Sequence, residues 1–236
     1  MATYAHSGDE SFRAQTGFYV PYSHMDDKDA ELFYTCMGVL LSFANQRLGI
    51  NEMGPLVVSE PENHMLTEAG GRVSEELWKH RELVADFVRE NPCGLTMEQL
   101  SVVAPWRYAL RDVFVVIAAN EDCAVYMNDD HLFAIGAMQD NADSHIHTIP
   151  SLLLLTLLPF EDGIVDDGKV IFLSDTPREK AIPLIKLQAH NLISEGVIST
   201  SVELINYSSA LPDENRVPPL YQEAIDSFYA EGGEAQ

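Results

Sequence analysis

A leucine-rich run, SLLLLTLLPF at 151–160, places six leucines and one phenylalanine within ten residues. Pro150 and Pro159 bracket its centre, and the run is far shorter than the ~20 apolar residues needed to cross a bilayer. A stretch of this kind belongs to the interior of a folded domain. We expect residues 151–158 to form a short helix or a buried segment packed against a sheet.

Three short apolar runs precede it, at 113–119, 123–127 and 131–137, and they are rich in β-branched and aromatic residues. The tripeptides NED and NDD separate them, which is typical of hairpin turns. The runs predict a three-stranded antiparallel meander, with the first strand in the middle of a sheet. Asp167-Gly168, between two further apolar runs, predicts a second hairpin.

Helical periodicity dominates the first half of the chain. Apolar residues recur at helical spacing over 26–49, with acids in the first turn and Gly49 as the stop. A second helix is expected over 73–92 with Ser74 as its cap. The other expected boundaries are a connector at 50–72 with a turn at Gly70-Gly71, and a short helix after Thr96 that ends at Pro105.

The last third of the chain is expected to contain two helices with a strand between them. Thr176-Pro177-Arg178-Glu179 is a capping box for a helix that runs to Gly196, in which Pro183 should kink the helix or delay its start. Residues 197–205 are expected to form an edge strand. A last short helix should begin at Pro218 or Pro219 and end in an acidic tail.

These elements predict an α+β fold. Residues 1–25 are expected to be poorly ordered, and residues 26–106 form a helical portion. Residues 107–236 form an antiparallel sheet or small open barrel with C-terminal helices, either as a separate unit or as one domain with 26–106.

The chain is strongly acidic. It has 14 Lys and Arg against 37 Asp and Glu, which gives a net charge of −23. Such a protein repels nucleic acid and anionic membranes and attracts basic proteins or cations. No Lys or Arg occurs between Arg111 and Lys169, but most acids in this stretch fall in expected turns. The acidity therefore serves solubility, or it selects a basic or neutral protein partner.

The three cysteines, Cys36, Cys93 and Cys123, are odd in number and far apart. This favours a reducing compartment over a disulfide framework. The first residues lack the basic and apolar segments of a secretory signal, so we expect a cytoplasmic protein. Cys36 lies on an apolar helical face, which predicts a buried, inert thiol, and Cys93 is the thiol expected to be exposed.

The best metal candidate is His145 and His147, which are two residues apart and face the same side of an extended chain. Asp140 and Asp143 add oxygen ligands, and imidazole with carboxylate suits zinc or another divalent ion. The alternative is a solvated polar loop. Because no further His or Cys cluster accompanies the pair, we assign neither a metal nor a cofactor.

Other candidate sites have simpler structural interpretations. His131 follows two aspartates that would raise its pKa for acid–base work, but Asn128-Asp129-Asp130 also suits a hairpin turn. No G-x-S-x-G sequence and no phosphate-loop spacing is present. Trp78 and Trp106 are expected to pack in the core or at its rim, with a partner anchor as the alternative.

Two stretches together resemble a known family. The first comprises Asn91-Pro92, Leu95-Thr96, Glu98, Leu100, Val103 and Trp106; the second comprises 157–160, Ile164-Val165 and Asp167-Gly168. In this order, with a meander between them, they resemble a family of uncharacterised microbial proteins with a helical front half and a small β module.

The resemblance covers about a third of the chain in loose motifs. Some members have a Cys-rich zinc-binding tail, which this chain lacks, so it implies no zinc role here. Asp166 stands where the resemblance leads us to expect an aromatic residue. The resemblance implies the architecture and no activity.

Three functional hypotheses remain open from the sequence. The leading one is a non-enzymatic protein-interaction or regulatory module, because no catalytic constellation is evident and the chain is acidic. The second is a metal-dependent enzyme that uses His145 and His147. The third is an acidic protein that mimics nucleic acid and inhibits a nucleic-acid-binding partner. The oligomeric state stays open.

Overall fold

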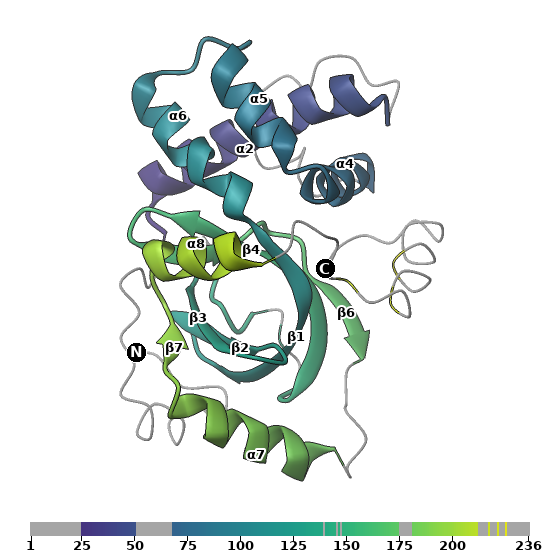
Figure 1. Cartoon of the computed structure of the whole chain (residues 1–236), viewed down its shortest axis with the longest axis vertical. Coiled ribbons are helices and arrows are strands. Elements are labelled where there is room, and N and C mark those ends of the chain that lie inside the picture. Colours follow the sequence, from purple (N-terminus) through teal and green to yellow (C-terminus); the bar gives the residue numbers. More distant parts are fainter. Residues whose placement is uncertain are drawn as a thin grey trace.

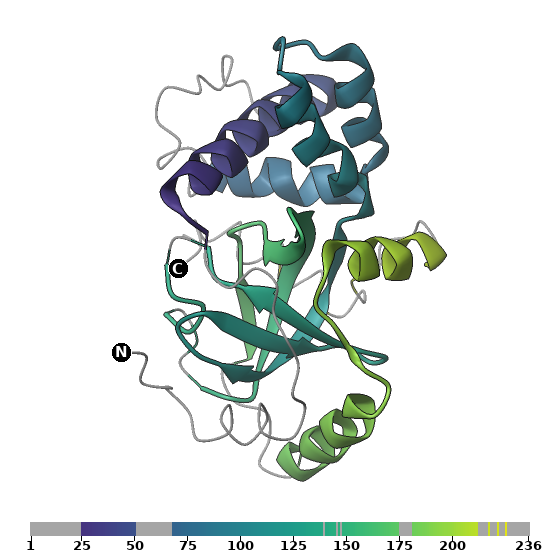
Figure 2. The same cartoon turned by 90° about the vertical axis from the view of Figure 1, so that its left-hand side faces the viewer.

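The protein has a helical layer stacked on a strongly curved sheet, with one further helix beside the sheet and another at its far end (Figures 1 and 2). A computed structural model describes residues 25–50, 68–138, 140–144, 146, 148–174, 181–211, and residues 217, 221 and 225. The sheet is mixed and seven-stranded, which confirms the expected α+β fold.

The helical layer begins with α2 (Asp27–Leu48), as the sequence predicts. The Asp26 side chain accepts a hydrogen bond from the backbone N–H of Asp29 at 2.9 Å and caps the helix. Gly49 ends it with a φ of 65°, a conformation that glycine adopts without strain. The remaining members of the layer are α4 (Glu68–Lys79), α5 (Glu82–Glu90), α6 (Met97–Val103) and the 3₁₀ helix η1 (Ala104–Tyr108).

The prediction of a single helix over 73–92 is wrong, because α4 and α5 are separate helices. The helical conformation is interrupted at His80 and Arg81, and the Arg81 guanidinium donates a hydrogen bond to the Ala109 carbonyl at 2.8 Å. α4 also starts earlier than expected, so Gly70 and Gly71 are helical rather than a turn. Ser74 consequently lies within α4 instead of capping it. By contrast, the Thr96 cap of α6 is confirmed as a capping box with Gln99.

The sheet has the strand order β5-β4-β1-β2-β3-β7, with β6 also paired to β4. Consecutive antiparallel pairing of β1, β2 and β3 confirms the predicted meander, and β1 lies mid-sheet between β2 and β4. The strand bounds are β1 Leu110–Ala119, β2 Cys123–Met127, β3 Leu132–Gly136, β4 Ser151–Phe160, β5 Gly163–Asp166, β6 Ile171–Ser174 and β7 Val197–Ile198.

The leucine-rich run is buried as expected, but it forms strand β4 and no helix. Leu153, Leu155 and Leu157 pack in the inner cluster of the curved sheet, while Leu158 and Phe160 face the helical layer. A strand covered on both faces carries apolar residues at successive positions, which removes the alternation that marks a half-exposed strand. This explains why the periodicity of the run did not identify it.

The hairpin expected at Asp167-Gly168 is also wrong. The turn at Glu161 and Asp162 connects β4 to β5, and β6 pairs with β4 further along the same edge. Asp167-Gly168 therefore interrupts an edge strand rather than reversing it. β5 and β6 each pair with β4 and not with each other. The Asp-Gly dipeptide indicates a local turn, but it does not indicate which strands pair.

Two helices follow the sheet. α7 (Ile182–Ile193) starts with Pro183 in its first turn, which confirms the delayed start, while the Thr176 box lies outside the described residues. The edge strand expected over 197–205 is limited to β7, and Thr200 caps α8 (Ser201–Ala210) in a capping box with Glu203. Leu204 of α8 packs in the inner cluster of the sheet. The last predicted helix lies almost entirely outside the described residues.

We predict that Leu153→Ala lowers the free energy of unfolding by about 2–5 kcal/mol, because the removed atoms leave a cavity in a close-packed core. The Leu153 side chain is fully buried in the inner cluster. Leu187→Ala is the matched control, since Leu187 is exposed on α7 and should change stability by less than about 0.5 kcal/mol. Urea unfolding of the two variants measures the difference; equal midpoints would contradict this account of the core.

Candidate functional site

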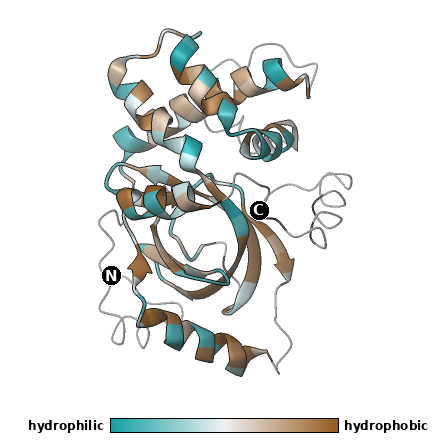
Figure 3. Cartoon of the chain, viewed as in Figure 1, coloured by the Kyte–Doolittle hydropathy of each residue, from teal (hydrophilic) through white to brown (hydrophobic). Residues whose placement is uncertain are grey.

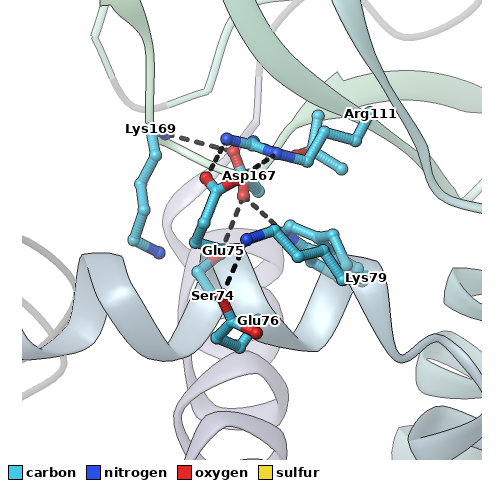
Figure 4. A network of polar contacts seen from close by, with 9 residues as sticks. Ser74, Glu75, Glu76, Lys79, Arg111, Asp167 and Lys169 are labelled. Atoms are coloured by element: carbon cyan, nitrogen blue, oxygen red, sulfur yellow. Dashed lines mark hydrogen bonds and ion pairs between the residues drawn. The ribbon is translucent and has the colours of Figure 1, made fainter. Parts of the chain in front are cut away.

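A buried polar cluster lies where α4 meets the sheet (Figure 4). We call it the interlayer cluster. α4 contributes three side chains, neighbouring strands β1 and β4 contribute one each, and the turn after β5 contributes two. Its members are Ser74, Glu75, Trp78, Arg111, Thr156, Asp167 and Lys169.

The Arg111–Glu75 ion pair is the centre of the interlayer cluster. The Arg111 guanidinium donates to both Glu75 oxygens, with an Nε–Oε1 distance of 3.2 Å, and its third nitrogen donates to Thr156 Oγ1 at 3.1 Å. Only 9% of the Arg111 side chain and 7% of the Glu75 side chain are exposed. All these guanidinium nitrogens thus have acceptors, which is the condition for burying such a charge.

Asp167 forms the second connection between the layers. Its Oδ2 atom accepts hydrogen bonds from Ser74 Oγ at 3.0 Å and from Trp78 Nε1 at 2.7 Å. Its backbone N–H donates to the Thr156 carbonyl at 3.1 Å, so the residue remains attached to β4 although it interrupts the edge strand. Ser74 and Trp78 are separated by one helical turn, which brings both donors to one face of α4.

Lys169 is the unusual member of the interlayer cluster. Its backbone N–H donates to Asp167 Oδ1 at 3.3 Å, but its Nζ atom is buried and has no hydrogen-bond partner in the described structure. Figure 4 shows the side chain running toward α4, with the amine turned away from the other labelled groups. Burial lowers the pKa of Lys169, and Arg111 lowers it further, whereas Asp167 and Glu75 act in the opposite direction.

Asp166, next to the cluster, faces the inner side of the sheet together with Ile164. Burial raises the pKa of the Asp166 carboxyl to about 6, and the charge of Asp167 adds to this, although a 2.7 Å hydrogen bond from the Gly168 N–H partly offsets it. Burial, with a smaller effect of Asp166, raises the pKa of Tyr34 to about 12 and that of Tyr126 still further. Both tyrosines are therefore uncharged near neutral pH, whereas Asp166 loses its proton as the pH rises through about 6.

Most polar side-chain groups of the interlayer cluster form hydrogen bonds or ion pairs that stabilise the fold. The Glu75 and Asp167 carboxylates and the Arg111 guanidinium are engaged with one another or with α4 and β4. They hold two layers together and are not aimed at a common external point. Only the Lys169 amine is left without such a role in the described part of the chain.

The sequence patterns did not predict the interlayer cluster, although they contain one signal of it. Arg111 and Lys169 are the two ends of the stretch without Lys or Arg, and both cations of the cluster come from these ends. Their 58-residue separation hid the contact, since pairing between β1 and β4 is what brings Arg111 to Thr156.

A smaller polar group occupies the turn that contains His131. As predicted, Asn128 makes the turn: its Oδ1 atom accepts from the N–H groups of Asp130 at 3.0 Å and His131 at 2.9 Å. Its amide donates to Asp112 Oδ2 at 3.3 Å and to the Tyr207 hydroxyl at 3.1 Å. The His131 ring packs edge-on against Tyr207, with 4.7 Å between the centroids. The turn interpretation is sufficient for these residues.

The metal prediction is untested, because His145 and His147 lie outside the described residues. Within the described ranges, no group of three or more His, Cys, Asp or Glu side chains is arranged to hold a metal ion. As predicted, Cys36 is buried, which raises its thiol pKa to about 12, and Cys93 is exposed.

The two tryptophans belong to the core, as expected. Trp78 and Trp106 are both buried in the cluster of side chains under the helical layer. Trp106 Nε1 donates to the Pro159 carbonyl of β4 at 3.1 Å, and Trp78 Nε1 donates to Asp167. Each ring thus joins the helical layer to the sheet by packing and by one hydrogen bond.

Comparison of the chain with protein-family models, with curated proteins and with solved structures finds no match. The resemblance in residues 91–106 and 157–168 therefore assigns no family. Among the helices that the structure describes, none has the length and apolarity required to cross a membrane.

We predict that Glu75→Gln destabilises the protein by about 3 kcal/mol or more, because it leaves the buried Arg111 charge without its counter-ion. Glu90→Gln is the matched control: Glu90 pairs with Arg47, but both side chains are substantially exposed, and the expected cost is about 0–1 kcal/mol. Urea unfolding measures both. Glu75→Leu combined with Arg111→Met removes both charges and should cost less than Glu75→Gln; the reverse order would refute the ion-pair argument.

We predict that Asp166→Asn stabilises the protein above pH 6. The folded-state pKa of about 6 exceeds the ordinary value of 3.8, so between these values the folded state binds more protons than the unfolded state. Stability of the parent protein then falls as the pH rises from about 4 to about 6, by about 1–3 kcal/mol. Asp166→Asn should abolish this fall, and the exposed Asp162→Asn should retain it. Denaturant midpoints between pH 4 and 8 provide the measurement; an unchanged profile in Asp166→Asn would contradict the assignment.

Proposed function

We propose that this protein is a non-enzymatic interaction or regulatory module that binds a basic or neutral protein partner through α7. The observation behind the proposal is an apolar pair on that helix: 67% of Leu184 and 58% of Leu187 are exposed. They are three residues apart and therefore adjacent on the helix surface. We call this pair the α7 ridge.

The α7 ridge points away from the sheet. The opposite face of the helix packs on the outer side of β2 and β3 through Ile185, Ala189, Leu192 and Ile193. α7 lies at the far end of the molecule from the helical layer, and Figure 3 shows hydrophobic colour along it. Large apolar side chains elsewhere are mostly buried, so a neighbouring exposed pair is a reasonable contact for another protein.

The charges beside the ridge favour a particular partner. The Gln188 amide donates to the Asp129 carbonyl at 3.1 Å, which places the β2–β3 turn next to α7. Leu184 is one helical turn from Gln188 and shares that flank. Asp129 and Asp130 are exposed there, so the flank is acidic. A partner with an apolar strip and a basic edge complements this arrangement, and the net charge of −23 disfavours nucleic acid and acidic proteins.

We predict that Leu184→Ser/Leu187→Ser weakens partner binding by about tenfold or more, because two apolar side chains no longer enter the interface. Affinity capture at low and moderate salt identifies the partner, and titration calorimetry with the purified partner measures its affinity. Val202→Ser is the matched control, because Val202 is 66% exposed on α8 and away from the ridge. Both variants should retain the urea midpoint of the parent protein.

Two results would count against the proposal in different ways. Failure to recover any specific partner at either salt concentration would argue against an interaction module. Equal affinity of the Leu184→Ser/Leu187→Ser variant and the parent would retain the module but remove α7 as its binding surface.

A further inference from the structure

The Lys169 amine is a chemically unusual group that the proposed interaction at α7 does not use. The residue is only 5% exposed, and its Nζ atom has no acceptor among the described residues. The nearby acceptors are already engaged: Glu75 binds Arg111, and Asp167 Oδ2 binds Ser74 and Trp78. An ammonium ion in such a place lacks the hydrogen bonds that would compensate its burial.

The charges around Lys169 define what the amine can become. The charged groups that act on it are the Arg111 guanidinium and the Asp167 and Glu75 carboxylates. With a neutral amine, these three leave one net negative charge in the interlayer cluster. The surroundings therefore accept a cation on this nitrogen but disfavour the approach of an anion. Burial lowers the pKa of Lys169, which increases the fraction of neutral, nucleophilic amine.

We infer that Lys169 is a covalent capture site for a small, uncharged aldehyde. The neutral amine attacks the carbonyl carbon, the resulting carbinolamine loses water, and a C=N bond replaces the C=O bond. The imine nitrogen then takes up one proton from the buffered solution and becomes an iminium cation, which neutralises the net charge left by Arg111, Asp167 and Glu75. The step is a stoichiometric modification that requires no redox partner.

The size and charge of the carbonyl compound follow from the same geometry. Gly168, between the buried residues Asp167 and Lys169, is exposed, so the backbone segment that carries Lys169 reaches the surface. A small neutral molecule would reach the amine when this segment opens locally. A carbonyl compound that carries a carboxylate or phosphate would meet the negative charge of the cluster and lose its hydration on entry.

Reductive trapping tests this inference on the full chain. The protein is incubated at pH 7 with propionaldehyde and cyanoborohydride, and peptide mass spectrometry follows propylation at Lys28, Lys79, Lys169, Lys180 and Lys186. An ordinary lysine, with a pKa near 10.4, is only about 0.04% neutral at this pH. We expect Lys169 to react at least about tenfold faster than exposed Lys186, and this preference should vanish in denaturing urea.

Matched variants and a second aldehyde complete the experiment. Lys169→Arg retains the positive charge and should remove the fast-reacting site, whereas Lys186→Arg should leave it intact. Glyoxylate, a small aldehyde with a carboxylate, should label Lys169 with less preference over Lys186 than propionaldehyde does. The inference is overturned if Lys169 in the folded parent reacts no faster than Lys186, which is the result for a purely structural lysine. Equal preference with glyoxylate would overturn the assigned substrate class.

Discussion

The buried ion pair between Arg111 and Glu75 determines how the two layers of this protein fit together. A guanidinium and a carboxylate can be buried only as a pair with their remaining hydrogen bonds satisfied, so positions of the helical layer that separate this pair are unfavourable. Asp167 reinforces this position by accepting from two side chains of α4. Apolar packing alone would favour contact between the layers without specifying its register.

Strand β4 makes this arrangement feasible because it is covered on both faces. Its inner side chains fill the concave side of the sheet, and its outer side chains contact the helical layer at one end and Val217 and Ile225 at the other. Thr156 lies on the outer face between these two apolar regions and supplies the polar contact to Arg111. The interlayer cluster therefore occupies the point where apolar cover is interrupted.

The two proposed activities use separate parts of the molecule. The α7 ridge lies at the end of the sheet remote from the helical layer, whereas Lys169 lies at the interface of the sheet with α4. Modification of Lys169 would change the charge balance of the interface that holds the layers together. A protein–protein contact through α7 would instead leave that interface intact, so one function does not depend on the other.

Local chemistry in the sequence determined the elements whose signals lie within a few residues. Asp26 and Gly49 delimit α2, Thr96 caps α6, and the turns before and after β2 predicted the meander. Tertiary pairing decided the rest. The sequence predicted a helix or a buried segment for β4, because both faces of the strand are covered and its apolar residues do not alternate. It predicted a hairpin at Asp167-Gly168, because only the pairing of β5 and β6 with β4 shows that these residues interrupt an edge strand. The interlayer cluster joins residues that are far apart in the sequence, such as Ser74 and Asp167 at a separation of 93 positions, and no local pattern encodes such proximity. Long-range contacts depend on the free energy of the whole packed structure, which a window of neighbouring residues does not contain.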